Sequence, residues 1–208
     1  PSLRPADADG RFDSCCSPAA VEDARGVAAQ LGIPHYVLNY EAEFDREVIR
    51  YFMDAYLSGE TPNPCVPCNS RLKFGSLLTR ARGWGAERVA TGHYARIRRD
   101  PGTGRYQLRR AVDSRKDQSY FLYGLTQEQL AAARFPVGHL TKEATRRIAA
   151  ELGLAVAGKP DSQEICFAPG DYRTYLRQRA GTAIVPGIVR DTGGAIRGRH
   201  PGLAFYTV

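Results

Sequence analysis

The sequence lacks any run of about 18 consecutive apolar residues, the length that a membrane-spanning helix requires. It also lacks a charged segment followed by an apolar stretch near its first residue, which is the pattern of a secretory signal peptide. We therefore expect a cytoplasmic protein without a membrane segment. Hydrophobic residues make up 43% and charged residues 25% of the 208 positions, ordinary values for a globular chain of one large domain or two modest ones.

Lysine is scarce, because the chain has four lysines against 25 arginines, and the formal net charge is +7. Basic side chains displace condensed counterions from a phosphate backbone, so this charge favours a polyanionic partner such as nucleic acid. An arginine-rich proteome would give the same balance without any nucleic acid partner. The charge alone therefore leaves both interpretations open.

The five cysteines form no complete metal-binding pattern. Nothing marks an oxidising compartment, so we expect reduced thiols. Cys65 and Cys68 make a C-x-x-C pair in a proline-rich loop, and such pairs are common in zinc sites. Neither a second C-x-x-C pair nor a histidine pair is present to complete a site, so we predict no structural zinc.

Hydrophobic spacing predicts helices that alternate with short strands, the pattern of a parallel α/β sheet. The expected helices are residues 17–31, 43–58, 69–84, 126–133, 141–152 and 171–180. The expected strands are residues 33–38 and 88–91, a hairpin of 94–97 with 106–109, and a strand within 200–208. The composition shifts after Leu122, and we place a domain boundary near residue 125.

The cysteines differ in what their surroundings suggest. Cys68 is expected at or just before the start of helix 69–84, where the helix dipole and unbonded N–H groups favour the reactive thiolate. The prolines before it stiffen the loop and would hold a nucleophile in place. Cys166 lies between two apolar neighbours, as a buried packing residue would. It becomes a candidate for chemistry only when it is considered together with Cys68. Cys15 and Cys16 are interpreted as packing residues.

Two further segments have chemistry that suits a nucleotide. Gly92 and His93 follow an expected strand, where open parallel sheets bind their ligands. Glycine lets the backbone approach a nucleotide, and the histidine can hydrogen-bond to a base or stack on it, although a solvated turn histidine would look the same. Lys116, Asp117 and Gln118 offer a cation, an acid and an amide, a mixture that suits a flipped-out nucleotide.

Taken together and in order, these segments resemble the tRNA-specific 2-thiouridylase family. The matching motifs are Thr61–Pro64 with Cys68–Asn69 and Lys73–Phe74, Ala90–Tyr94, Asp113–Ser114 with Lys116–Leu122, Phe135–Gly138, and Asp161–Ser162 with Ile165–Phe167. The resemblance covers nearly the whole chain. It implies an adenine-nucleotide α-hydrolase-like (Rossmann-like) α/β domain with a parallel sheet over residues 1–125, followed by a small mixed α+β central domain over residues 126–208.

The resemblance also implies a role for individual residues. Cys68 matches the family's nucleophilic cysteine, Cys166 matches the cysteine that carries a persulfide, and Gly92 matches an ATP-contacting position. The positions that match tRNA contacts are Asn63, Pro64 and Cys65 at the target base, together with His93, Lys116, Asp117 and Gln118.

The implied reaction is the thiolation of the wobble uridine of a tRNA, with ATP and Mg²⁺ as cofactors. ATP adenylates the uridine C2 oxygen, and sulfur from the Cys166 persulfide displaces AMP, directly or after release as hydrosulfide. Cys68 then resolves the persulfide, which leaves a Cys68–Cys166 disulfide. The implied partners are tRNA and a sulfur-donor protein, either a cysteine desulfurase or a sulfur-relay protein.

The chain departs from the family pattern in two ways. The Ser-Gly-Gly-x-Asp-Ser pyrophosphate loop and the C-terminal β-barrel are absent, so we interpret the chain as a fragment that is inactive alone. Cys65 stands where many relatives have aspartate, so Cys65, Cys68 and Cys166 could instead hold an iron–sulfur cluster. A non-catalytic tRNA-binding remnant and a related adenylating enzyme for a small molecule are further alternatives.

Overall fold

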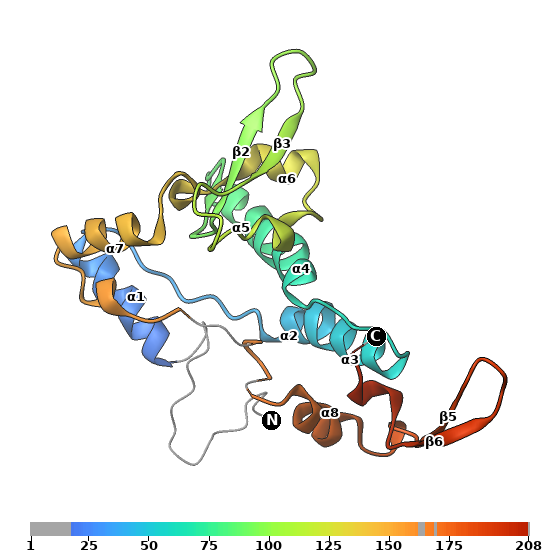
Figure 1. The fold of residues 1–208 in the computed structure, drawn as a ribbon. Coiled ribbons are helices and arrows are strands. Elements are labelled where there is room, and N and C mark those ends of the chain that lie inside the picture. The colour runs from blue at the N-terminus through green and yellow to red at the C-terminus, as the bar shows by residue number, and fades with distance from the viewer. Residues whose placement is uncertain (1–17, 162–164, 169, 208) are drawn as a thin grey trace. The chain divides into compact units, whose positions relative to one another are not determined.

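The computed structural model describes residues 18–161, 165–168 and 170–207 (Figure 1). These residues form two compact units. The first consists of residues 18–25, 49–64 and the described residues from 161 onward, and the second consists of residues 26–48 and 65–160. Helix α1 (Pro18–Gln30) has residues in both units, and so does the helix formed by α2 (Glu41–Phe44), π-helical η1 (Asp45–Ile49) and α3 (Arg50–Leu57).

The second unit contains a parallel strand pair and an antiparallel hairpin. Strand β1 (Val89–Ala90) pairs in parallel with β4 (Ala133–Arg134), and β2 (Ala95–Arg99) pairs antiparallel with β3 (Tyr106–Arg110). Besides α2 and its parts of α1 and η1, this unit contains the helices α4 (Cys65–Pro67), π-helical η2 (Cys68–Ser76), α5 (Leu77–Gly83), α6 (Gln127–Ala132) and α7 (Lys142–Glu151). Its 3-10 turns are η3 (Ser119–Leu122), η4 (Pro136–His139) and η5 (Ala155–Gly158).

The core of the second unit is one apolar cluster around the parallel pair. Its buried members are Phe74, Ala95, Leu122, Leu125, Leu130, Ala133 and Phe135. Fully burying one of the large side chains contributes about 1.5–3 kcal/mol, so this cluster is a main source of the unit's stability. Leu122 and Leu130 lie on either side of position 125, so the boundary that we placed there lies inside this cluster.

Side-chain caps begin three of the helices near the residues that the sequence predicts. The Thr126 hydroxyl accepts a hydrogen bond from the Gln129 N–H, and the Gln129 side chain accepts one from the Thr126 N–H, which is a complete capping box. Thr141 caps α7, and Asp171 caps α8 (Tyr172–Ala180) of the first unit. The residues that determine these helix starts therefore lie within three positions of each cap.

The first unit is held together by an aromatic cluster. The Phe52 ring of α3 lies 5.1 Å from the Phe167 ring, at an interplanar angle of 90°, and the Phe167 ring lies 5.4 Å from Tyr175 of α8. The Arg177 guanidinium lies over the Phe205 ring at 4.5 Å. A hairpin of β5 (Gly187–Arg190) and β6 (Ile196–His200) and the 3-10 turns η6 (Gly181–Ala183) and η7 (Leu203–Phe205) complete this unit.

Two predicted strands are wrong. Residues 33–40 have neither helix nor strand structure, because no strand pairs with them among the described residues. Residues 201–207 contain the 3-10 turn η7 instead of a strand, and β6 ends at His200. Across the described chain, no helix is long and apolar enough to cross a membrane.

Gly138 provides a close backbone contact in the second unit and gives a test of its packing. A Cβ atom at Gly138 would lie 1.7 Å from the Ala95 carbonyl oxygen, a backbone atom that cannot rotate away. Gly138→Ala is therefore expected to lower the free energy of unfolding by about 1–3 kcal/mol or more, measured as a lower urea midpoint. Gly26→Ala in α1 is the matched control, because its Cβ meets nothing within 4 Å. It is expected to stabilise by about 0.5–1 kcal/mol, and equal midpoints for both variants would contradict this packing.

Candidate functional site

The Cys68 thiol lies on a continuous helix that runs from Cys65 to Gly83. The expected start near Cys68 is therefore wrong by one turn: Cys65 is the first helical residue and Cys68 the fourth. Pro67 is compatible with this start, because the first N–H groups of a helix have no intrahelical acceptor to lose. Cys68 remains in the first turn, where the helix dipole still favours a thiolate.

The helix takes a π-helical form from Cys68 onward, which alters its backbone bonding. The Gln129 side-chain amide donates to the carbonyl oxygens of Ser70, at 2.7 Å, and Phe74, at 3.0 Å. The Ser70 hydroxyl donates to the Val66 carbonyl at 3.0 Å. Such π-helical turns occur often at functional sites, and here the Gln129 side chain satisfies two carbonyl groups of the helix that carries Cys68.

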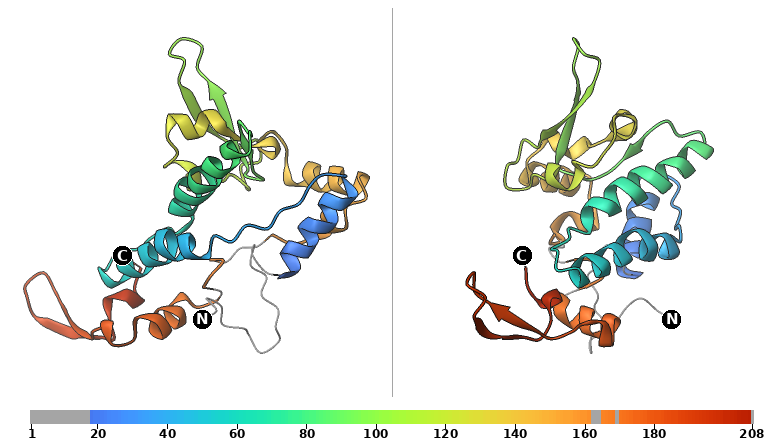
Figure 2. Two further views of the ribbon diagram at one scale, coloured as in Figure 1. Left: turned by 180° about the vertical axis from the view of Figure 1, so that it is seen from behind. Right: turned by 90° about the vertical axis from the view of Figure 1, so that its right-hand side faces the viewer.

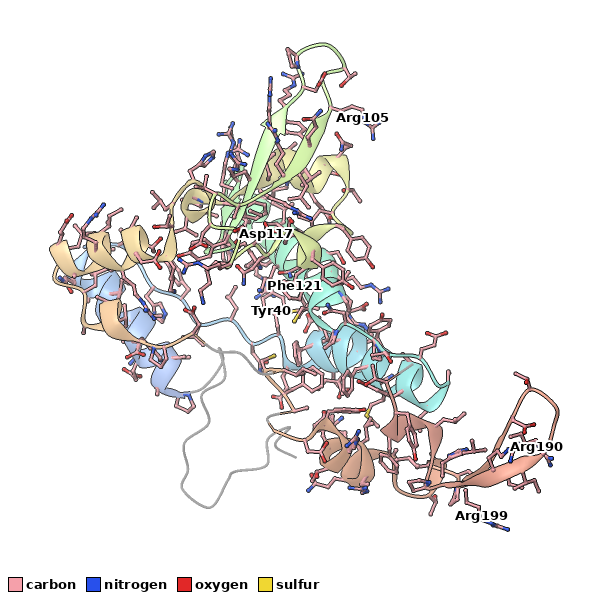
Figure 3. All side chains as sticks on the ribbon, viewed as in Figure 1. Tyr40, Arg105, Asp117, Phe121, Arg190 and Arg199 are labelled. Carbon is pink, nitrogen blue, oxygen red and sulfur yellow. The ribbon has the colours of Figure 1, made fainter. Side chains whose placement is uncertain are left out.

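Asn69 connects the same helix to the predicted motif Lys116–Leu122. Its side chain is 3% exposed, and its amide nitrogen donates to the Phe121 carbonyl in η3 at 3.2 Å. Its side-chain oxygen is buried with no hydrogen-bond partner among the described residues. Asn69, the residue next to Cys68, therefore holds the helix against residues 119–122. Phe121 of this segment is labelled in Figure 3.

The motif Ala90–Tyr94 is joined to the motif Lys116–Leu122 by a reciprocal pair of hydrogen bonds. The Gln118 N–H donates to the Tyr94 carbonyl at 2.8 Å, and the Tyr94 N–H donates to the Gln118 side-chain oxygen at 3.0 Å. Asp117 accepts from the Ala111 N–H and from the Ser119 hydroxyl, both at 2.7 Å. Both side chains thus hold backbone in place, and the structure brings three of the predicted motifs together in one unit.

A buried carboxylate organises the turn that contains Lys116. Asp113 is 5% exposed, and its carboxylate accepts hydrogen bonds from the backbone N–H groups of Lys142 and Arg115. These bonds, that from Lys142 above all, hold the pKa of the Asp113 carboxyl below its usual value. The Lys116 N–H donates to the Asp113 carbonyl at 3.1 Å, and the Lys116 side chain is partly exposed. The turn therefore presents a cation on a fixed backbone.

His93 is buried rather than solvated. Its ring is packed 5.8 Å from Phe135 and 6.4 Å from Phe74, and its Nδ1 lies 2.6 Å from the Thr91 hydroxyl. Burial lowers the pKa of His93 to about 4, helped by the nearby charge of Lys73. At neutral pH the ring is uncharged, and its predicted contact with tRNA stays a prediction.

Gly92 fits the approach of a nucleotide. It follows β1, it is exposed, and a Cβ atom placed on it would meet nothing within 4 Å. Nothing among the described residues therefore obstructs the Gly92 position after β1, and its predicted contact with ATP stays a prediction. Among the described residues, no group of three or more His, Cys, Asp or Glu side chains is arranged to hold a metal ion.

The remaining predicted residues belong to the first unit. Asn63 and Pro64 precede the Cys65 helix, and Pro64 is buried. Cys166 is partly exposed, while the next residue, Phe167, is buried in the aromatic cluster. Cys65, Cys68 and Cys166 carry thiols, so the implied Cys68–Cys166 disulfide is not formed in this structure. Cys15 and Cys16 lie outside the described residues.

The sequence alone assigns no role to Asn69, Asp113 and Gln129 of the second unit, nor to Phe167, the buried neighbour of Cys166 in the first unit. Asn69 and Asp113 were part of the motifs that carry the resemblance, yet their roles depend on partners far along the chain. A polar residue inside an amphipathic helix is the one local signal that would have drawn attention to Asn69. The second unit also has an open hollow that contains none of the predicted residues, lined by Tyr40, Glu43, Ser76, Thr79, Arg80, Gly83 and Trp84.

The buried His93 ring gives a pH dependence with a defined sign. Its folded pKa of about 4 lies below the value of about 6.5 of an unfolded chain, so the unfolded chain takes up the proton first. The free energy of unfolding should therefore fall as the pH is lowered from about 6.5 to about 4. An NMR titration of the His93 ring should give a midpoint near 4. In His93→Gln this part of the pH dependence should vanish, and a midpoint near 6.5 in the wild type would contradict the burial.

Comparison with known proteins places the chain in a family. The tRNA methyl transferase HUP domain family matches residues 4–170. The tRNA-specific 2-thiouridylase MnmA of Heliobacterium modesticaldum is 55% identical over 202 residues, which cover 96% of this chain and 52% of that protein. That of Moorella thermoacetica is 56% identical over 195 residues, which cover 93% of this chain and 55% of that protein. That of Desulfitobacterium hafniense is 53% identical over 210 residues, which cover 100% of this chain and 56% of that protein.

The chain spans about half the length of these curated relatives. The family match confirms the predicted fold class, an α/β fold of the adenine-nucleotide α-hydrolase-like type, to which the parallel pair β1–β4 belongs. Because the match extends over most of the residues, this chain belongs to the tRNA methyl transferase HUP domain family.

Proposed function

We propose that this chain is the catalytic and central part of an enzyme that replaces oxygen by sulfur at C2 of a tRNA uridine. One observation carries the proposal. The helix of Cys68, the strand end at Gly92–Tyr94 and the turn of Lys116–Gln118 are hydrogen-bonded into one assembly. Relatives that are 55% and 56% identical are named tRNA-specific 2-thiouridylases, which supports the same chemistry here.

The proposed reaction has two chemical stages. The uridine C2 oxygen attacks the α-phosphorus of ATP and releases pyrophosphate, which turns that oxygen into a good leaving group. The terminal sulfur of a Cys166 persulfide then forms a bond to C2, and AMP departs with the oxygen. The Cys68 thiolate attacks the Cys166 sulfur and breaks the S–S bond, so that C2 keeps the outer sulfur and a disulfide remains. A thiol reductant restores both cysteines.

The surroundings of Cys68 suit this role. The thiol is partly exposed, and its place in the first turn of the helix stabilises the thiolate that must attack. Directly after that turn, Asn69 donates to the Phe121 carbonyl and the Gln129 side chain donates to the Ser70 carbonyl, so the sulfur is attached to a helix that is bonded to the rest of its unit. Nucleophiles gain rate from such positioning, because misplacement by about 1 Å is costly.

The turn of Lys116 suits a contact with RNA. The side chains of Asp117 and Gln118 are engaged with the backbone of this segment. Lys116 is charged and partly exposed, so it can reach a phosphate. We infer that Asp117 and Gln118 support the tRNA contact mainly by shaping this turn. The sulfur itself comes from a donor protein, for which the partly exposed Cys166 is the acceptor.

The iron–sulfur mechanism is the alternative that a specific observation favours. Cys65 and Cys68 lie three residues apart in one helical turn, so both thiols project from the same face. Two neighbouring thiolates with Cys166 as a third would leave one iron open to bind sulfide. The role of Cys65 separates the mechanisms, because the persulfide route does not use its sulfur.

Cysteine variants of the full-length protein test the chemistry. Cys68→Ser and Cys166→Ser should each lower 2-thiouridine formation by a factor on the order of 10³ or more, as loss of a nucleophile commonly does. The measurement is mass spectrometry of nucleosides from the treated tRNA. Cys15→Ser is the control and should leave the activity near that of the wild type.

The same assay separates the two mechanisms. Under the persulfide route, Cys65→Ser retains activity and the anaerobically purified protein works without iron. Loss of activity in Cys65→Ser, together with bound iron, would replace that route by the cluster mechanism. Full activity in Cys166→Ser would remove the persulfide.

Lys116→Ala tests the RNA contact. Loss of one phosphate contact should weaken tRNA binding and reduce the slope of the logarithm of affinity against the logarithm of salt concentration by about 0.7–0.9. Binding is measured with an unmodified tRNA transcript at several salt concentrations. Lys159→Ala removes the same charge elsewhere in the second unit and should leave the slope unchanged. A slope that is the same in both variants would remove Lys116 from the contact surface.

A further inference from the structure

The hairpin of β2 and β3 carries an unusual density of positive charge. Residues 95–110 contain six arginines against a single acid, Asp100. The arginines are Arg96, Arg98, Arg99, Arg105, Arg109 and Arg110. The hairpin stands out from α5 and α6 of its own unit in every view (Figure 1, Figure 2), and the labelled Arg105 side chain projects away from it (Figure 3).

The strand register sorts these side chains onto two faces. Ile97 is paired with Leu108, and both are packed against the apolar core of the unit. Side chains alternate along a strand, so the residues between them point the other way. That outer face holds Arg96 opposite Arg109 and Arg98 opposite Gln107. We call these four residues the basic face.

The arginines of the basic face form no close ion pair among the described residues, although the hydrogen bonds of its own turn and the charge of Arg98 lower the pKa of the nearby Asp100 carboxyl. The Arg96 Nε atom donates instead to the Arg110 carbonyl oxygen, at 2.7 Å. The Asp100 carboxylate accepts from the N–H groups of the turn at 2.8–3.0 Å and from the Gln107 amide at 3.2 Å. Arg96 directly opposite Arg109 is a like-charge pair, which weakens a hairpin. Such an arrangement suits an external anion.

We propose that the basic face binds the sugar–phosphate backbone of a double-helical stem of the tRNA, a step that rests on the proposed function. Guanidinium groups bind phosphate oxygens through paired N–H bonds. Alternate residues of a strand lie about 6.6 Å apart, so Arg96 and Arg98 can reach neighbouring phosphates. Double-stranded RNA is recognised through its shape, phosphates and 2′-hydroxyls, which a rigid two-stranded ribbon can follow.

A nucleic acid fits this face better than a protein partner does. The cores of protein interfaces are enriched in aromatic and apolar residues, whereas all four residues of the basic face are polar or charged. Contacts to phosphate position an RNA without reading its sequence. The basic face would therefore raise the affinity for tRNA in general and leave the choice of the target uridine to the site around Cys68.

The test removes two charges from the basic face of the full-length protein. Arg98→Gln/Arg109→Gln is compared with Arg88→Gln/Arg147→Gln, which removes the same charge from exposed positions elsewhere in the second unit. Binding of an unmodified tRNA transcript is measured between about 50 and 200 mM salt. The basic-face variant should bind several-fold more weakly, with a salt slope smaller by about 1–2, while the control keeps the wild-type slope. The variant Arg98→Lys/Arg109→Lys should retain most of that slope.

The outcomes separate this proposal from the function on which it rests. At saturating tRNA the basic-face variant should thiolate at the wild-type kcat, with the loss confined to KM, and its urea midpoint should match or exceed that of the wild type. If the Arg98→Gln/Arg109→Gln enzyme is active and keeps the wild-type salt slope, the proposal that the basic face binds tRNA is overturned while the proposed function stands. A wild-type protein that neither binds nor thiolates tRNA would overturn the function. Competition by single-stranded RNA as strong as that by a duplex would overturn the assignment to a stem.

Discussion

The reciprocal pair of hydrogen bonds between Tyr94 and Gln118 is the constraint on which the candidate site depends. It joins the residue immediately before β2 to a loop that has little regular structure of its own. The same loop continues into η3, whose Phe121 carbonyl receives the Asn69 amide from the Cys68 helix. A segment with few apolar contacts is thereby fixed on both sides. Without these bonds the loop would be among the least stable parts of the unit, as exposed backbone usually is.

The distribution of charge on the surface depends on which groups the acidic side chains contact. The carboxylates of Asp113 and Asp117 are occupied by backbone N–H groups inside the fold. Asp100 is likewise used by the turn of the β2–β3 hairpin. Of these three acids, only Asp113 forms an ion pair with an arginine among the described residues, with its Oδ1 atom 3.7 Å from the Arg115 Nε atom. The excess of positive charge in the composition therefore becomes a positive surface on particular elements, rather than an average property of the chain.

Local chemistry explains which parts of the fold could be predicted. The caps at Thr126 and Thr141 act within four residues, so the sequence was enough to place both helices. The strand expected at residues 33–38 needs a neighbour that pairs with it, and none is found among the described residues. The role of Asn69 depends on a carbonyl 52 residues away, which no pattern of neighbours contains. At Cys68 the prolines suggested a loop, although the first turn of a helix accepts proline.

The burial of Phe167 limits how far the neighbouring Cys166 thiol can move. Adjacent Cα atoms are about 3.8 Å apart, so a thiol beside an anchored ring sweeps only a short radius about that anchor. A thiol on a long flexible segment could accept a sulfur atom at one place and transfer it at another. Here a single peptide unit links the two residues. If Cys166 carries the sulfur as proposed, its loading and its transfer would both take place close to the aromatic cluster, unless the Phe167 ring leaves that cluster between the two steps.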